Sequence, residues 1–432
     1  MQNSAHINRP LNELGVTAIV RGVHAGHFAA ADVVRSCLER ISERGPAIRA
    51  WVAVSNESGL QQAMALGHKA ALPLAGVPFG VKDVLDTSEL PTEMGSQLYA
   101  GHRPSFDAAC VGRVRAAGAV MIGKTVTAEF AGTQPTHTRN PHDPARTPGG
   151  SSSGSAAAVA DFMVPFAFGT QTGGSVLRPA SFCGVVGFKP SFGFYPVAGM
   201  KPAARSFDTV GLLARHAEDI ALLHAVLMNG AAGRPHDAPP RLGVFRSHLW
   251  DTVHPDTQDA MERALADLRR AGAQVSELQM PEGFDTITAH RAVINAHERA
   301  GDLAAEWDAG HARVSAQTRD VCQRGMAIDA DRYIAAREAI ERFRSVADVL
   351  FGDADLLVMP TAPGPAPQGH DNAGDPRLQE IWTALHMPSI SLPVLRSSDH
   401  LPVGLQLVGR RFHDGRLLHA AQWIEAKLLP AQ

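Results

Sequence analysis

Three patterns in this chain of 432 residues predict an α/β fold. Helical periodicity over residues 107–118 is followed directly by a strand-like run at 119–123. Residues 77–86 form a β-prone apolar segment that is typical of a buried strand. Between residues 147 and 191, a nearly uncharged stretch holds apolar runs that predict a further buried helix and strand. Helices that alternate with strands in this way are typical of helical layers packed on a sheet.

The overall composition is that of an ordinary globular protein, with 45% hydrophobic and 19% charged residues. The net charge of −3 gives no sign of binding to nucleic acid or to an anionic membrane. None of the 4 cysteines forms a CxxC pair, which argues against a disulfide framework and a zinc ribbon. Because neither a signal-peptide core nor an apolar run of about 18 residues is present, we expect a cytoplasmic protein.

The N-terminal part is expected to begin with an amphipathic helix over residues 28–44. Gly45-Pro46 is a typical stop signal and is predicted to end this helix. A strand at residues 51–54 and a short helix near 59–70 are predicted to follow.

Lys82 lies in the middle of the predicted strand at residues 77–86. Burying an ammonium group is costly and usually lowers its pKa. One interpretation is a structural ion pair with Asp83 or Asp86. The other is a catalytic lysine, because a desolvated lysine is suited to act as a neutral base. The pattern alone leaves both open.

Two glycine–serine turns, at residues 149–154 and 173–175, bracket the apolar runs of the central stretch. Glycine lets the backbone approach a ligand closely, and consecutive N–H groups in such turns can hold negative charge. A serine beside those groups is the arrangement that acyl transfer needs. A flexible linker does not explain the apolar runs, and neither turn fits the spacing of a phosphate loop.

The second half is predicted to continue the alternation. Its expected elements are a helix near 215–228, a connector at 232–240, a strand at 242–245, a helix at 256–271 with Met261, Leu265 and Leu268 inward, a strand at 355–363, and a hairpin at 389–394 and 402–409.

Charged side chains are scattered over a helical region at residues 284–351. They are most simply interpreted as a solvated face: Arg291, His297, Glu298, Arg299 and Arg313. The loop at 124–142 contains His137 and His142, but no acid or cysteine pattern near them indicates a metal site.

The segments around Lys82, Ser151 and Ser175 resemble the amidase signature family of Ser-cisSer-Lys hydrolases. The resemblance covers most of residues 70–215 and roughly the last 80, and almost none of 230–350. It implies an amidase signature fold, a mixed central β-sheet flanked by helices. It also implies a single domain over 1–432, with a core at about 28–230 and 352–428. The variable region at about 240–351 would include a helical cap near the site at 284–350.

The resemblance also implies catalytic roles. Ser175 corresponds to the nucleophile, Ser151 to the bridging serine that follows a cis peptide bond, and Lys82 to the base. The backbone N–H groups of Thr172, Gly173, Gly174 and Ser175 would form the oxyanion hole. Such a site needs neither a metal nor an organic cofactor. The neighbouring Ser152, Ser153 and Ser155 are expected to be structural hydrogen-bond formers.

Two departures from the common family pattern concern the second turn. Gln171 stands where an aspartate is usual, and Arg178 is displaced by one position. Both resemble a branch that includes malonamidase-type enzymes, in which such an arginine holds a substrate carboxylate. A guanidinium suits that task because it binds carboxylates bidentately. Arg178 and Gly150 are therefore predicted to contact the substrate, and the alternative is that Arg178 braces the loop through backbone carbonyls.

The leading functional hypothesis is a stand-alone amide hydrolase with a Ser175 acyl-enzyme, which releases ammonia or an amine and a carboxylic acid. A second is a glutamine amidotransferase component that works within a tRNA-dependent assembly, disfavoured by Gln171 and Arg178. A third, a catalytically dead scaffold, is disfavoured by the intact serines and lysine. We expect a small-molecule amide as partner, no nucleic acid and no membrane, and leave open a homodimer. Four residues could line a pocket or belong to the core: Met94, Phe130, Trp382 and His386.

Overall fold

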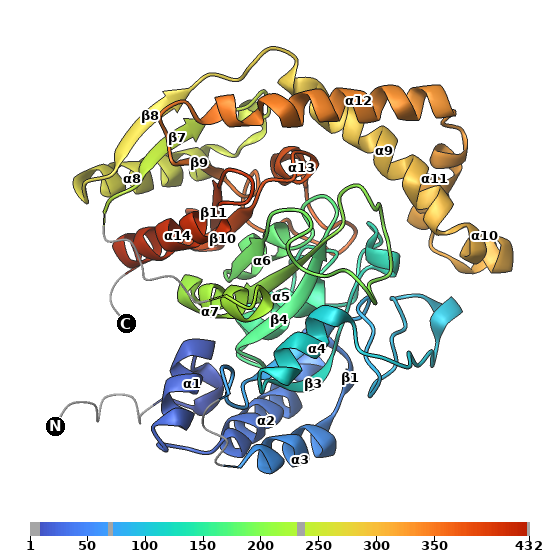
Figure 1. Ribbon diagram of the computed structural model, residues 1–432, viewed down its shortest axis with the longest axis vertical. Coiled ribbons are helices and arrows are strands. Elements are labelled where there is room, and N and C mark those ends of the chain that lie inside the picture. Colours follow the sequence, from blue (N-terminus) through green and yellow to red (C-terminus); the bar gives the residue numbers. More distant parts are fainter. Residues whose placement is uncertain (1–8, 68–71, 231–237, 430–432) are drawn as a thin grey trace.

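The computed structural model describes residues 9–67, 72–230 and 238–429. One 11-stranded sheet runs through it in the order β1-β3-β2-β4-β6-β5-β10-β11-β9-β7-β8. Helices flank this sheet, and the helices α9 to α12 lie together at one end of the molecule (Figure 1). The predicted α/β fold with a mixed sheet flanked by helices is confirmed.

The sheet is built from eleven strands. They are β1 (Trp51–Val54), β2 (Pro78–Lys82), β3 (Val120–Thr125), β4 (Phe166–Gln171), β5 (Val186–Lys189), β6 (Thr209–Ala214), β7 (Arg241–Phe245), β8 (Gln274–Leu278), β9 (Leu356–Pro360), β10 (Ser389–Arg396) and β11 (Pro402–Val408).

The α-helices pack around these strands. In the described residues they are α1 (Val16–His24), α2 (Ala30–Ile48), α3 (Asn56–Leu66), α4 (Ala109–Ala116), α5 (Ser153–Ala160), α6 (Leu177–Cys183), α7 (Ala217–Leu227), α8 (Pro255–Arg270), α9 (Ile287–Asp302), α10 (Ala304–Gly310), α11 (Ala316–Met326), α12 (Ala330–Val346), α13 (Arg377–Ala384) and α14 (Asp414–Leu428).

Strand direction is mixed. β2 is parallel to both β3 and β4, while β4 and β6 are antiparallel. β10 and β11 form the predicted antiparallel hairpin, and β7 is parallel to β8 and β9. Every residue of β2, β3, β4 and β6 is buried, because helices cover this part of the sheet on both faces. The strands that carry or flank the candidate catalytic residues thus lie in the enclosed core of the sheet.

The predicted end of the first amphipathic helix is wrong. α2 continues through Gly45 and Pro46 and ends at Ile48. Proline removes one backbone donor, but Arg49 N still donates to Gly45 O at 2.8 Å. Ile48 is fully buried, and this contact with the core holds the last turn in place despite the unfavourable local sequence.

Several short elements were not expected from the sequence: α6, β5, β6 and β8. The first three are seven residues or fewer and lie in or near the glycine-rich stretch, where periodicity is too short to be recognised. The predicted helix at 59–70 begins earlier, as α3, and residues 68–71 lie outside the described residues. Most of the predicted connector at 232–240 also lies outside them.

The helical region predicted at 284–351 is confirmed, and α9 packs against α11, α12 and α13. The interpretation of its charged residues as a solvated face is wrong for two of them. Arg291 is 7% and Arg299 is 4% exposed. Both lie on α9. Arg291 donates to the backbone carbonyl of Thr172, and Arg299 donates to that of Phe130. Tertiary contacts that local sequence does not reveal therefore bury these guanidinium groups.

Candidate active site

Lys82 is the last residue of β2 and is fully buried. Its Nζ donates to Ser151 Oγ at 2.7 Å and to Thr170 Oγ1 at 2.8 Å. Burial lowers the pKa of Lys82 well below its ordinary value, Asp208 opposes this shift and Arg299 adds to it. A neutral amine that contacts a serine hydroxyl is the arrangement a general base requires.

The ion-pair interpretation of Lys82 is not what the structure contains. Asp83 instead pairs with Lys124, with 3.0 Å between Nζ and Oδ1 and both side chains fully buried. Lys124 also donates to Thr92 Oγ1 at 2.6 Å and to Leu85 O at 3.0 Å. The charge of Asp83 is therefore neutralised by the neighbouring strand, and Lys82 is left to contact hydroxyl groups.

Ser151 lies in the first glycine–serine turn, just before α5. The peptide bond between Gly150 and Ser151 is cis, as the family resemblance implied. Ser152 N donates to Ser175 O at 3.3 Å, which joins this turn to the second one. Ser152 and Ser155 donate to the carbonyls of β4 residues, at 3.3 and 2.9 Å, in agreement with their predicted structural role.

The second turn, residues 172–175, is held by its carbonyl groups. Thr172 O accepts from Arg291 at 2.9 Å, and Gly173 O accepts from Thr383 Oγ1 at 2.6 Å. Gly174 O accepts from Arg178 N at 2.9 Å. In contrast, the N–H groups of residues 172–175 donate to no acceptor within the part of the chain that the structure describes. Anchored carbonyls and available N–H groups are what an oxyanion hole requires.

Gln171, which stands where an aspartate is usual in the family, braces the second turn. Its Oε1 accepts from the backbone N–H groups of Val176 at 2.9 Å and Leu177 at 3.1 Å. Its Nε2 donates to Thr383 Oγ1 at 3.0 Å. The neutral amide supplies both an acceptor and a donor, so it ties the turn to α6 and to α13 at once.

Arg178 is 5% exposed and donates to two backbone carbonyls. Nη1 contacts Gly374 O at 2.6 Å, and Nη2 contacts Gly150 O at 2.7 Å. These are the bonds of the loop-bracing alternative. Gly150 thus touches Arg178 through its carbonyl.

A cavity of about 410 Å³ opens beside the second turn. The sheet half contributes residues 172–175 and Arg178, and the cap contributes Arg291, Asn295 and Arg299 from α9. The last three are spaced by four residues, which places them on one face of the helix. The sequence reasoning missed this lining, although a polar stripe at that spacing is a signal that could have been read.

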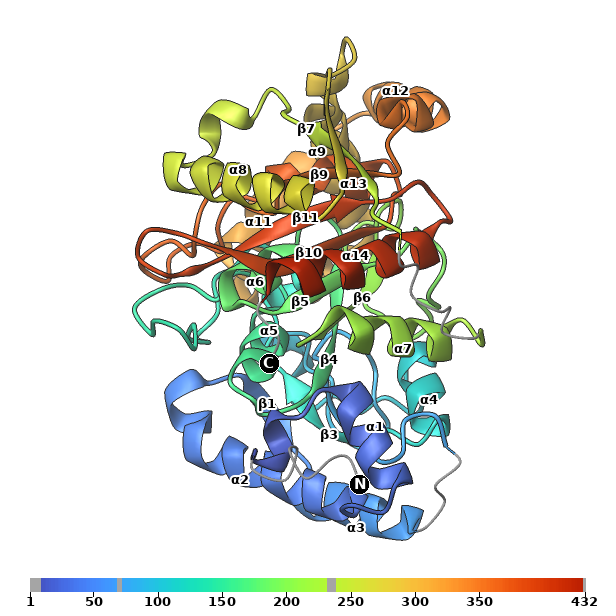
Figure 2. The same ribbon diagram turned by 90° about the vertical axis from the view of Figure 1, so that its left-hand side faces the viewer.

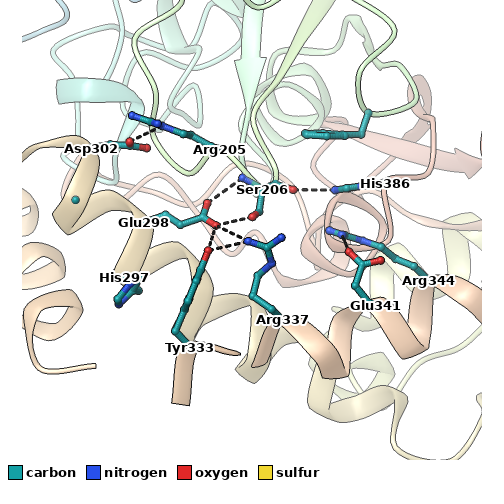
Figure 3. A pocket seen from close by; sticks show the side chains of 12 residues that line it. Arg205, Ser206, His297, Glu298, Asp302, Tyr333, Arg337, Glu341, Arg344 and His386 are labelled. Atoms are coloured by element: carbon teal, nitrogen blue, oxygen red, sulfur yellow. Dashed lines mark hydrogen bonds and ion pairs between the residues drawn. The ribbon is translucent and has the colours of Figure 1, made fainter. Parts of the chain in front are cut away.

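A second cavity, of about 690 Å³, is lined by α9 residues of an adjacent face of the helix, among them Glu298 and Asp302 (Figure 3). Glu298 accepts there from Ser206 N at 2.8 Å and from Tyr333 OH at 2.8 Å. Arg205 pairs with Asp302 at 2.6 Å. The charged groups drawn in this cavity are therefore largely paired with one another.

The four aromatic and sulfur residues left open by the sequence divide between core and cavity. Met94 and Phe130 belong to one buried apolar cluster, and Trp382 belongs to another. His386 lines the second cavity, where it stacks on Phe192 with 3.9 Å between the ring centres. None of the four lines the cavity beside Ser175.

Among residues 9–67, 72–230 and 238–429, no cluster of three or more His, Cys, Asp or Glu side chains is placed to bind a metal ion. In the same residues, no helix combines the length and apolar character needed to cross a bilayer.

A buried lysine that contacts a serine, next to a serine-bearing turn with available N–H groups, is the arrangement expected of a serine–lysine hydrolase. The model of the amidase family matches residues 32–418, and the chain belongs to that family. It is therefore an amidase-family hydrolase, a class that acts on carbon–nitrogen bonds.

Similar proteins include an amidotransferase subunit and two solved amidases. The A-subunit of glutamyl-tRNA(Gln) amidotransferase from Chloroflexus aggregans is 33% identical, over 94% of this chain and 95% of that protein. A solved amidase superposes with a TM-score of 0.89 at 29% identity, covering 96% of this chain and 100% of the other. The peptide amidase from Stenotrophomonas maltophilia gives a TM-score of 0.85 at 26% identity, covering 97% and 98%.

Proposed function

We propose that this protein hydrolyses a small amide through an acyl-enzyme on Ser175, with Lys82 and Ser151 as the proton relay. The observation that carries the proposal is the 2.7 Å hydrogen bond from the buried Lys82 Nζ to Ser151 Oγ. A serine hydroxyl is a weak nucleophile unless a base removes its proton. The neutral Lys82 is that base, and Ser151 transmits the proton because a hydroxyl donates and accepts at once.

Each step of the reaction then has a named group. Ser175 Oγ attacks the amide carbonyl while its proton passes to Ser151, whose own proton passes to Lys82. The oxyanion forms against the N–H groups of residues 172–175, where one such donor contributes roughly 2.7–4 kcal/mol. The relay runs backward to protonate the leaving amine. Water then attacks the acyl-enzyme by the same path, and releases the carboxylic acid.

The test is covalent labelling combined with turnover. Ser175→Ala is expected to abolish both ammonia release from small amides and labelling by a serine-directed phosphonate. Ser151→Ala and Lys82→Ala are expected to reduce kcat by about a thousandfold or more, in line with the loss of a positioned base. Circular dichroism checks that each variant folds. Full activity of Lys82→Ala would refute the relay.

Within this function, the malonamidase-like specificity is a finer proposal. The substrate would be a small amide that also carries a carboxylate, held within the cavity of about 410 Å³. The two bonds of Arg178 to Gly374 O and Gly150 O support a role in fixing the walls of this cavity. A panel of malonamate, malonamide, aryl amides and a peptide amide tests the preference, because one solved relative is a peptide amidase.

A second candidate is a glutamine amidotransferase component of a tRNA-dependent assembly. The observation that favours it is the 33% identity to such a protein over nearly the full chain. In that case glutamine would be the amide, and the ammonia would pass to a partner protein. Purified chain that hydrolyses small amides but not glutamine, and gains nothing from a cell extract that supplies partners, would exclude this candidate.

The remaining parts of the proposal concern context. We propose a cytoplasmic protein whose partner is its small-molecule substrate, without nucleic acid or membrane, and whose copies can form a homodimer. Sedimentation of the purified chain at several concentrations tests the last point, and gel shift with transfer RNA tests the exclusion of nucleic acid.

A further inference from the structure

Among the buried cations around the second turn, residues 172–175, Arg299 differs in how few of its N–H donors are used. It lies on the cavity-facing side of α9, is 4% exposed and lines the cavity that also holds Ser175. Of its five N–H donors, one is used: Nη1 donates to Phe130 O at 3.0 Å. Its Nε and Nη2 have no acceptor among the described residues.

No carboxylate of the described chain forms an ion pair with Arg299. Of the two carboxylates in the cavity lining, Glu380 pairs with Arg291 at 2.9 Å, and Asp371 does not pair with Arg299. The nearby Asp208 is occupied by Thr172 Oγ1 at 2.5 Å and by the N–H groups of Ala203 and Ala204. The charge of Asp208 acts on Arg299 from a distance and opposes the lowering of its pKa by burial, but no carboxylate of the described residues touches the guanidinium. The open edge of this buried guanidinium is therefore suited to receive an anion.

The other arginines of the lining are already engaged. Arg178 gives both terminal nitrogens to backbone carbonyls, and Arg291 divides its own between Glu380 and Thr172 O. Arg324 is 60% exposed and pairs with Asp320 at 2.9 Å. The second cavity shows the contrast, since its cations Arg205 and Arg337 each have a carboxylate partner (Figure 3).

From this we infer that Arg299, and not Arg178, binds the anionic end of the substrate, a carboxylate that the Nε–Nη2 edge of its guanidinium holds in a bidentate pair. The inference rests on the proposed amide hydrolysis and names the substrate class: a short amide that carries a carboxylate a few bonds from the scissile carbonyl. Bidentate arginine–carboxylate pairs combine charge with fixed orientation. Arg299 would thereby orient the amide toward Ser175 from the cap side of the cavity.

The test compares malonamate with malonamide, which differ in one carboxylate. In Arg299→Gln, kcat/KM for malonamate is expected to fall roughly 10- to 100-fold, as for loss of one charge-assisted pair. The value for malonamide reports any loss that arises from the effect of Arg299 on Lys82, so the ratio of the malonamate value to the malonamide value is the diagnostic quantity and is expected to fall roughly tenfold or more. Arg313→Gln, at an exposed cap residue, removes the same charge and should leave both unchanged. An unchanged malonamate preference in Arg299→Gln, or its loss in Arg313→Gln, would overturn the inference.

Two further measurements keep the inference apart from the proposed function. Phosphonate labelling of Ser175 should persist in Arg299→Gln. If the wild type itself is not labelled, the proposed hydrolase is refuted, but the anion site is not. Malonate should raise the melting temperature of the wild type and of Arg299→Lys, but not of Arg299→Gln. Equal protection of Arg299→Gln, or no protection of the wild type, would refute the anion site even if no amide is turned over.

Discussion

The burial that suits Lys82 to its proposed role as a base also has a cost in stability. Burial lowers the pKa of Lys82 well below 10.5 in the folded protein, whereas the unfolded chain keeps the ordinary value of 10.5. At pH values between the lowered pKa and 10.5, unfolding takes up a proton. The free energy of unfolding must therefore rise as pH increases through this window. A buried lysine that serves as a base would therefore be a source of instability at pH values below 10.5.

We predict that Lys82→Met removes this pH dependence and abolishes turnover. The free energy of unfolding of the wild type should gain up to about 1.4 kcal/mol per pH unit relative to the variant within that window. Urea denaturation at pH 7, 8 and 9 measures the difference. Ser151 and Thr170 lose a hydrogen-bond donor in the variant, which shifts its free energy of unfolding by a constant amount. The diagnostic quantity is therefore the change of the free energy of unfolding with pH. Parallel profiles would mean that Lys82 is charged in the fold.

A second buried titratable group, Glu425 on α14, couples two helices. Its Oε2 accepts from Ala217 N, the first residue of α7, at 2.9 Å. Burial raises the pKa of Glu425 to about 7, the bond to Ala217 N opposes this, and Asp219 and Glu218 add to it. Because the folded state holds this proton up to a higher pH than the unfolded chain, Glu425 lowers stability as pH rises from about 4.3 through 7.

Glu425→Gln is predicted to stabilise the protein at pH 8 and to change it little at pH 4.5. Glutamine keeps an acceptor for Ala217 N and carries no charge at either pH. Melting temperatures of both proteins at the two pH values test this prediction. An equal difference at pH 4.5 and pH 8 would argue that Glu425 does not titrate between them.

At the scale of elements, the cap depends on the close approach of α9 and α11. Gly325 of α11 faces the backbone of α9, where an added Cβ would overlap Ala296 O. The α9 helix also bears Arg291, which anchors Thr172 O in the catalytic turn. The position of α9 thus connects cap packing to the geometry of the oxyanion site.

Gly325→Ala is predicted to push α11 from α9, to lower stability by about 1–3 kcal/mol and to reduce kcat. Gly301→Ala is the matched control, since Gly301 lies in α9 with no atom near its added Cβ. There, alanine should be neutral or stabilising by up to about 1 kcal/mol. Denaturation and kinetics of the two variants measure the contrast. Similar losses in both would show that helix glycines matter here for another reason.

At the scale of the molecule, chain order and sheet order differ widely. β5 lies between β6 and β10 in the centre of the sheet (Figure 2). A strand from the first half of the chain is thus paired there with a strand near its C-terminus. The cap enters between β8 and β9 in sequence and covers the site formed by strands from the first half. The domain limits inferred from the sequence remain a prediction, because a continuous sheet does not by itself define a folding unit.

For the whole chain, we predict that purified protein hydrolyses a small amide without any partner. All the groups of the proposed relay and oxyanion turn come from this one chain, and the cavity beside them has walls from both the sheet and the cap. Ammonia release by gel-filtered protein measures this. Activity that appears only after a partner is added would favour the amidotransferase interpretation.

The sequence alone determined the α/β class, the helical cap and the candidate residues Lys82, Ser151 and Ser175. The fold class and the helical region follow from local periodicity, whereas the three candidate residues follow from the resemblance of their segments to the amidase signature family. The continuation of α2 through Pro46 escaped it, since the core contact of Ile48 outweighs the local stop signal.

Only the tertiary structure decided how the charges are partnered. It assigned Asp83 to Lys124, turned Arg178 toward two backbone carbonyls, and buried Arg291 and Arg299 in the wall of the catalytic cavity. These facts depend on contacts between segments that are distant in sequence. The energy of a charge is set by what surrounds it in space, and a linear pattern does not contain that information.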